Sequence, residues 1–399
     1  MDKQEIIFKQ NLFVLAIAVF IAGIGFSEAL PFLPLYIKTL GTFTHKELNF
    51  WVGFTFSTTY FVSALVSPWW GKLADQKGRK LMILRSSIGM AIAIGSMGFV
   101  TNVYQLFCLR MLQGFFAGFV SNANALIATE SPKNQAGKAM GTMAASFTAG
   151  NLLGPLLGGL LASMFTYHFT FLLTGILLFI SFILSFLFVK EEFKPISKQS
   201  VITNKQVINS LKSPNLIFGL LLTTIIIQTA NSSINPIVAL YVANLMHNQG
   251  NTIFVAGIIA ALPGVATFLA APRFGELGDK IGTHKIIIGG LISAIIFFFT
   301  TAFVTNAVQL GVLRFLIGFS DACLFSQVQT MLAKNSSIQT TGRIFSWNQS
   351  AMYIGNIFGP LVGSTVAGFF NYNVLFIVTA ALVGINLLLF HINVVKNIN

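Results

Sequence analysis

The segment Gly71-Lys-Leu-Ala-Asp75-Gln-Lys-Gly78-Arg79-Lys80 lies between two long apolar runs and is rich in glycine and charge. Gly71 allows two helix ends to approach closely, and Gly78 can adopt the positive φ of a tight turn. Asp75 can accept hydrogen bonds from Arg79 or from the start of a neighbouring helix. The segment predicts a charged turn that can hold a gate closed; the alternative is an ordinary turn whose basic residues mark the cytoplasmic side.

A second copy of this segment occupies residues 275–285, where Thr283-His284 replaces the pair Arg79-Lys80, so we expect a weaker latch there. A shift of 204 or 205 residues also superposes many other Gly, Pro and polar positions. The pairs include Pro31 and Pro236, Tyr36 and Tyr241, Pro68 and Pro272, Gly71 and Gly275, Asp75 and Asp279, Gly78 and Gly282, Asn102 and Asn306, Gln105 and Gln309, Arg110 and Arg314, Gly154 and Gly359, Pro155 and Pro360, and Gly158 and Gly363. The two halves of the chain are therefore copies of one unit.

Long apolar runs surround both copies of the segment. The chain of 399 residues is 55% hydrophobic and only 9% charged, whereas soluble domains average roughly 25% charged residues. A helix needs about 20 apolar residues to cross ~30 Å of hydrocarbon, and a transmembrane barrel would instead show strictly alternating segments of ~10 residues. Twelve runs qualify: residues 11–36, 48–72, 81–101, 103–129, 138–163, 168–189, 215–243, 252–275, 285–304, 307–333, 343–368 and 372–395. We predict an all-α integral membrane protein with twelve transmembrane helices in a lipid bilayer.

The twelve spans divide six and six around a polar, lysine-rich segment. We expect a first six-helix bundle over residues 1–189, a cytoplasmic linker over residues 190–214 and a second bundle over residues 215–399. Two parallel repeats around a site at the midplane are one of the plans of secondary transporters.

The basic residues fix the expected orientation of these spans. With both termini in the cytoplasm, Lys38 and Lys46 lie outside, Arg110 and Arg314 lie within spans, and the remaining 20 of the 24 Lys and Arg face the cytoplasm. This is a strong positive-inside pattern. Because the cations sit in short gaps and form no basic groove with interleaved aromatic residues, the net charge of +13 does not indicate nucleic-acid binding.

Two of the eleven acids lie within spans, Glu28 in the first and Asp321 in the tenth. A carboxylate cannot stay ionised in hydrocarbon unless it is paired, so both are candidate proton carriers. Arg110 cannot lose its charge and must face the bundle interior. The alternative is a structural ion pair of Glu28 with Arg110 or of Asp321 with Arg314.

Polar side chains recur within other spans. Gln228, Asn231, Ser232 and Asn235 follow each other at helical steps in the seventh span and form one polar stripe. Such amides either join helices or line a cavity, and we favour a substrate cavity between the first and seventh spans. Further candidate substrate-binding residues are Ser121 and Asn124, which follow Arg110 on nearly the same helical face, and the aromatic residues Phe26 and Tyr60.

The fifth span contains the stretch Gly150-Asn-Leu-Leu-Gly154-Pro155-Leu-Leu-Gly158. Glycines at every fourth position give a smooth face for close helix packing, and Pro155 removes a backbone donor and can bend the helix. The pattern predicts a packed helix seam, which can also serve as a gating hinge.

Four segments, residues 31–36, 71–80, 110–114 and 150–159, resemble signature motifs of the major facilitator superfamily. Together with the twelve spans and the duplicated halves, the resemblance covers the whole chain. The chain is most similar to the twelve-span drug:proton antiporter family. Within that family it resembles the MdtG and PmrA group of bacterial multidrug efflux proteins at residues 31–36, 122–128 and 342–346. The resemblance implies a multi-pass protein of the bacterial cytoplasmic membrane that exports amphipathic compounds in exchange for protons by alternating access. It also implies gating by Gly71, Asp75, Gly78, Arg79, Lys80, Gly150, Gly154, Pro155 and Gly158.

Two other functions remain possible from the sequence. One is a dedicated exporter of a sugar or another single metabolite; the other is a polytopic membrane enzyme, for which no catalytic constellation is found. No ATP-binding or dinucleotide fingerprint occurs, and neither the histidines nor Cys108 and Cys323 have metal-ligand spacing. We therefore expect a monomeric transporter that is not an enzyme and needs no cofactor or metal.

Overall fold

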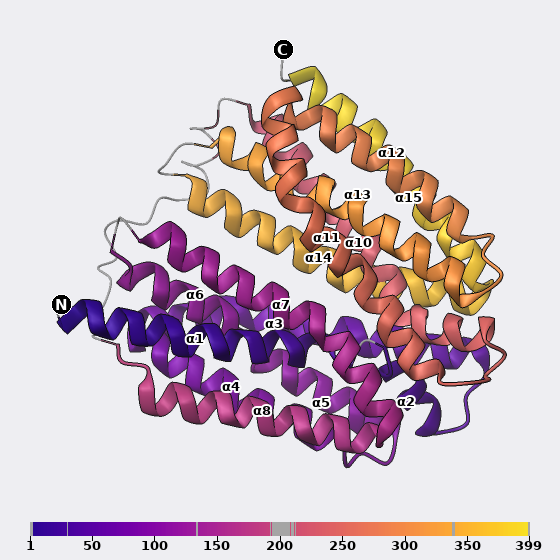
Figure 1. Cartoon of the computed structure of the whole chain (residues 1–399), viewed down its shortest axis with the longest axis horizontal. Helices are drawn as coiled ribbons and strands as arrows, with labels where there is room; N and C mark the ends of the chain where they lie inside the picture. The colour runs from indigo at the N-terminus through magenta and orange to yellow at the C-terminus, as the bar shows by residue number, and fades with distance from the viewer. Residues whose placement is uncertain are drawn as a thin grey trace. The chain divides into compact units, whose positions relative to one another are not determined.

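The computed structural model describes residues 3–29, 31–132, 135–191, 213–336 and 340–397, together with 193, 208 and 211 (Figure 1). All elements in these ranges are helical, in order α1 (Lys3–Ser27), α2 (Leu33–Thr39), α3 (His45–Lys77), α4 (Arg79–Met97), α5 (Val103–Phe115), α6 (Phe119–Glu130), α7 (Ala136–Met164), α8 (Tyr167–Phe188), α10 (Pro214–Leu245), α11 (Thr252–Ile281), α12 (Thr283–Thr301), α13 (Ala307–Lys334), α14 (Thr341–Phe369), α15 (Tyr372–Asn393) and the 3-10 turn η2 (Val395–Asn397). The predicted linker falls outside the described residues at 192, 194–207, 209, 210 and 212.

The helices have the length and composition of membrane spans. Within the described ranges, 11 helices are long and apolar enough to cross a membrane, with residues 103–130 taken as one. α14, a 29-residue helix at the position of the predicted span 343–368, is not among these 11. The prediction of an all-α integral membrane fold is confirmed.

The chain divides into two compact units. Unit 1 comprises Met1–Thr42 and Thr58–Ser197, and unit 2 comprises Phe43–Ser57 and Lys198–Asn399. In unit 1, α1 packs along α7 and α4 along α8; in unit 2, α10 packs along α14 and α12 along α15 (Figure 1). The pairings follow the sequence repeat.

The first part of α3 belongs to unit 2, where it packs on α14. The Ser57 hydroxyl donates a hydrogen bond to the Ile357 carbonyl at 2.7 Å, and His45 Nε2 lies 2.9 Å from the Ala367 carbonyl oxygen. The predicted first bundle therefore differs from unit 1 in one segment: Phe43–Ser57 was expected in the first bundle and belongs to unit 2.

The same polar pair occurs at two helix starts that the internal repeat relates. The Asn102 side chain accepts from the Gln105 backbone N–H at 3.0 Å, and Gln105 Oε1 accepts from the Thr101 N–H at 2.8 Å. Asn306 and Gln309 form the same reciprocal cap at α13. Each cap satisfies backbone donors that the first turn leaves unpaired, which gives both copies the same helix start.

Two predicted spans are interrupted. The first was expected over 11–36, but α1 ends at Ser27 because Pro31 has no N–H to continue the helix, and Glu28 lies in the following turn. The fourth was expected over 103–129, but α5 ends at Phe115 and Gly118 adopts φ +111° before α6 begins.

Side chains from α3 and α4 satisfy the carbonyls freed at the break between α5 and α6. Trp70 Nε1 donates to the Phe115 carbonyl at 2.8 Å, and Arg85 donates to the Ala117 carbonyl at 2.7 Å. The Arg85 guanidinium also stacks over the Trp70 ring at 3.6 Å. Backbone carbonyls at such a break need hydrogen-bond donors. Trp70 and Arg85 supply them, so other helices of unit 1 stabilise the interruption between α5 and α6.

Candidate functional site

The carboxyl group of Glu28 is enclosed within unit 1. It is 2% exposed and hydrogen-bonded to the hydroxyl of Thr174 on α8, while its Oε1 has no hydrogen-bond partner among the described residues. The alternative, a structural ion pair with Arg110, is not found among the described residues; Arg110 Nη1 donates instead to Gln113 Oε1 at 3.0 Å. Thr174 was missed by the sequence reasoning.

Asp321 on α13 has a different environment in unit 2. It is partly exposed, and Asn231 of α10 donates to its Oδ1 at 2.7 Å. Arg314 lies two turns earlier on α13 and is buried, yet among the described residues no ion pair joins it to Asp321. The two acids therefore differ in environment: Glu28 is fully enclosed, whereas Asp321 is partly exposed.

The predicted polar stripe of α10 divides between two neighbouring helices. Gln228 Nε2 and Ser232 Oγ both donate to Asn356 Oδ1 of α14, at 2.8 and 2.6 Å. Asn231 instead turns toward α13, and Asn235 is partly exposed. Several of the amides thus join helices in this structure. Asn356 was also missed, although a polar residue inside the span 343–368 was a usable signal.

The candidate substrate residues of unit 1 come from three helices. Phe26 of α1 packs edge to face against Phe147 of α7, with ring centroids 6.4 Å apart, and Tyr60 of α3 is half-buried. On α6, the Ser121 hydroxyl donates to the Gly118 carbonyl at 3.0 Å.

The helical period that placed Ser121 and Asn124 on nearly the same face as Arg110 does not run unbroken between them. The expectation assumed one continuous helix, and the break at Gly118 interrupts the 3.6-residue period. Asn124 nevertheless has a buried side-chain oxygen without a partner among the described residues.

The predicted glycine seam is confirmed, and its partner is α1. A Cβ added at Gly150 would collide with the Phe20 carbonyl, one at Gly154 would lie 3.1 Å from the Glu28 N, and one at Gly158 would collide with the Glu28 carbonyl. Pro155 lies buried within the same helix. The seam therefore ends directly on the backbone of the buried acid.

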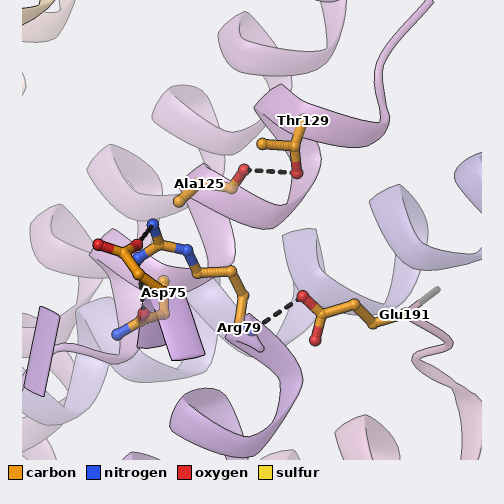
Figure 2. Close-up of polar contacts among 6 residues, drawn as sticks. Asp75, Arg79, Ala125, Thr129 and Glu191 are labelled. Carbon is orange, nitrogen blue, oxygen red and sulfur yellow. Dashed lines mark hydrogen bonds and ion pairs between the residues drawn. The ribbon is translucent and has the colours of Figure 1, made fainter. Parts of the chain in front are cut away.

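The charged turn after α3 forms as predicted (Figure 2). Gly78 has φ +94°, and Arg79 Nη2 pairs with Asp75 Oδ1 at 2.7 Å. Arg79 Nη1 also lies 3.5 Å from Asn122 Oδ1 of α6. Gly71 makes no close approach, since an added Cβ would meet no described atom within 4 Å.

A second acid takes part in this turn. The Glu191 carboxylate accepts from the backbone N–H group of Arg79 at 2.8 Å (Figure 2). It also accepts from the backbone N–H group of Lys80 at 2.7 Å. A carboxylate at the start of α4 satisfies orphan donors and complements the helix dipole. The sequence analysis missed Glu191, whose signal was an acid at the exit of the sixth span, beside Lys190.

The second copy of the turn is built differently. Asp279 pairs with Lys334 of α13 at 2.7 Å instead of with a basic residue of its own turn. The pair is well exposed, so it contributes little stability.

Comparison with known proteins agrees with the duplicated helical architecture. The family model described as Major Facilitator Superfamily matches residues 15–241 and 220–397. The chain belongs to the major facilitator superfamily. Two curated members of the superfamily are multidrug resistance proteins MdtG: the protein of Escherichia fergusonii is 47% identical over 95% of this chain and 93% of its own length, and that of Escherichia coli is 46% identical over the same shares.

Solved structures of distant members of the superfamily share the fold. A bacterial homologue of the human lysosomal transporter Spinster superposes with a TM-score of 0.79 at 14% identity, covering 96% of this chain and 97% of that chain. The nucleoside transporter NupG superposes with a TM-score of 0.75 at 14% identity, covering 96% and 99%. At such low identity these similarities concern the fold alone.

Proposed function

We propose that the protein is a proton-coupled multidrug efflux transporter of the bacterial cytoplasmic membrane, with both termini in the cytoplasm. The observation that carries this proposal is the similarity of 46–47% over 95% of the chain to multidrug resistance proteins. Asp321 within α13 and Glu28 in the buried turn directly after α1 support coupling to protons, since intramembrane acids commonly form proton pathways.

The different environments of the two acids suggest different roles. Glu28 is enclosed, so it binds a proton without meeting the substrate directly, and Arg110 provides a fixed positive charge whose field acts on it. Asp321 is accessible and attracts cationic amphipathic substrates, with Asn231 and the neighbouring amides supplying hydrogen bonds. Within unit 1, the candidate substrate contacts are Phe26, Tyr60 and Asn124.

A proton gradient is sufficient to drive such export. One proton that enters gains ~2.3 kcal/mol per 100 mV, which corresponds to a substrate gradient of roughly fifty-fold before any pH difference is added. Alternating access requires that the gates open one at a time, and we assign the cytoplasmic gate to the turn at residues 71–80 and the hinge to the seam of Gly150, Gly154, Pro155 and Gly158.

Efflux in cells tests the proposed function. Expression in a bacterium that lacks its own drug pumps should lower the accumulation of several unrelated amphipathic dyes, and these dyes should compete with one another. A protonophore should abolish the effect. Export of a single sugar or metabolite without competition from dyes would instead support a dedicated exporter.

The orientation can be tested by labelling single cysteines in a variant that lacks Cys108 and Cys323. Cysteines that replace Thr42 and Asn248 should react with an impermeant thiol reagent in sealed cells, because we place both loops outside. A cysteine at the exposed Gln76 should react only after the cells are opened. Labelling of Gln76→Cys in sealed cells would reverse the orientation.

The turn after α3 is tested by Asp75→Asn, which keeps the shape but removes the charge that pairs with Arg79. We expect normal insertion and a reduction in efflux of about five-fold or more. A reduction of this size corresponds to a coupling free energy of about 1 kcal/mol, which is typical. Asp279→Asn is the matched control in the second copy and should have a smaller effect, because Asp279 pairs with a different helix. Equal efflux in Asp75→Asn and wild type would show that the turn is a topological signal only.

A further inference from the structure

The contact between Glu28 and Thr174 has a counterpart in unit 2. The internal repeat superposes Glu28 on Ser233 and Thr174 on Thr379, each by a shift of 205 residues. In unit 2, Ser233 Oγ of α10 lies 3.3 Å from Thr379 Oγ1 of α15, and both side chains are buried. The two repeats therefore bring equivalent positions together, and the first repeat places a carboxyl group where the second has a hydroxyl group.

The hydroxyl protons of the second repeat are used within their own helices. Ser233 Oγ donates to the Ala230 carbonyl at 2.7 Å, and Thr379 Oγ1 donates to the Leu375 carbonyl at 2.9 Å. Because each hydroxyl group has one proton, none remains for the contact between the two side chains. The long distance between their oxygens follows from this.

The first repeat needs one more proton than the hydroxyl group of Thr174 supplies. Thr174 Oγ1 lies 3.1 Å from the Thr170 carbonyl of its own helix and also contacts the Glu28 carboxyl group. A single hydroxyl proton cannot fully satisfy both acceptors. A protonated Glu28 resolves the conflict: its O–H donates to Thr174 Oγ1, and Thr174 donates to Thr170.

The surroundings of Glu28 favour the same assignment. An ionised Glu28 would leave a buried, charged Oε1 without a hydrogen-bond partner among the described residues, which is unfavourable. Arg110 acts on Glu28 electrostatically, but its hydrogen bond goes to Gln113. Both observations leave Thr174 as the group that Glu28 contacts directly.

No other charged group comes close on the helices that pack against α1. Their charged and titratable side chains in the described ranges are Glu130 of α6, Lys138 of α7, and Tyr167 and His168 of α8. Lys138 lies 20 residues before Gly158, which contacts Glu28, and this corresponds to ~30 Å along the helix. Glu130 accepts a hydrogen bond from Asn11, which lies in the N-terminal half of α1, far from Glu28. The His168 ring contacts the Gly98 carbonyl.

We propose that Thr174 is the positioning residue for the transported proton. Its hydroxyl oxygen accepts the hydrogen bond of protonated Glu28, so Thr174 stabilises the proton-bound state and joins α1 to α8 in that state. This inference rests on the proposed function, in which Glu28 carries a proton.

Substrate-induced proton release tests the assignment. Ethidium is added to the purified full-length protein in detergent, and the released protons are measured across a series of pH values. Thr174→Val keeps the shape but removes the acceptor, so we expect the midpoint of release to move to lower pH by about half to one unit. Thr174→Ser should retain the wild-type midpoint. Thr379→Val is the matched control in unit 2 and should leave the midpoint unchanged.

The direction of the shift decides the inference. A midpoint moved to higher pH would show that Thr174 donates to ionised Glu28, and an unchanged midpoint would show that the contact has no role in proton binding; either result overturns the proposal. If Thr174→Val does not fold, Thr174→Ala removes the same acceptor and gives the same comparison. Undiminished release from Glu28→Gln would overturn the proposed carrier itself, whereas loss of release in Glu28→Gln with no shift in Thr174→Val would overturn only the role of Thr174.

Discussion

Glu28→Gln should abolish uphill, pH-driven efflux while leaving substrate binding and downhill exchange measurable. The glutamine side chain has the shape of the protonated acid and can donate to Thr174, so the contact between α1 and α8 is kept. It cannot release a proton, and the exchange of proton for substrate is therefore blocked. The measurement compares concentrative dye transport with counterflow exchange in the same vesicles.

The control for this variant is Asp321→Asn, which should lose cationic substrates first and still export neutral ones. Removal of the negative charge weakens the attraction of a cation in a low-dielectric environment. Concentrative transport that persists in Glu28→Gln would contradict the assignment of Glu28 and move the proton-carrying role to Asp321.

Gly158→Ala should cause the largest loss of stability and transport among single substitutions in the α1–α7 seam. The new Cβ would overlap the backbone carbonyl of Glu28, and neither helix can yield locally because both are packed along their length. Overpacking of this kind costs about 1–3 kcal/mol. The readouts are the thermal unfolding temperature of the purified protein and dye efflux in cells.

Gly141→Ala is the matched control on the same helix, because an added Cβ there meets no described atom within 4 Å. It should retain stability and efflux. Equal behaviour of the two variants would show that α1 and α7 do not depend on the close approach at Gly158.

The sequence predicted those features that follow from short-range patterns. Apolar runs located the helices, the shift of 204 or 205 residues revealed the repeat, and the glycines at 150, 154 and 158 predicted a packed seam. Gly78 and Asp75 predicted the geometry of the turn after α3. In each case the feature is caused by residues within one helix or one turn, so the local sequence is sufficient to predict it.

Other features depend on which helices become neighbours. The pattern within one span does not predict which side chains of another helix it will contact. Thr174 is an ordinary polar residue of α8 until α1 places Glu28 beside it, and Glu191 caps α4 only because α8 ends there. The break at Gly118 needs donors from Trp70 and Arg85 on two other helices. The polar residues of α10 were expected to form one stripe because the helical periodicity places them on one face. The periodicity does not show that some of them contact α13 and others α14.

Reconstitution in liposomes with an imposed pH gradient tests proton-coupled efflux most directly. Uptake of ethidium and movement of protons are followed together in the same vesicles, with the voltage clamped. We expect ethidium to accumulate against its gradient only when the pH gradient is present, with protons moving in the opposite direction, and Glu28→Gln to eliminate both movements. Ethidium that only equilibrates, or that accumulates without any proton movement, would contradict the account.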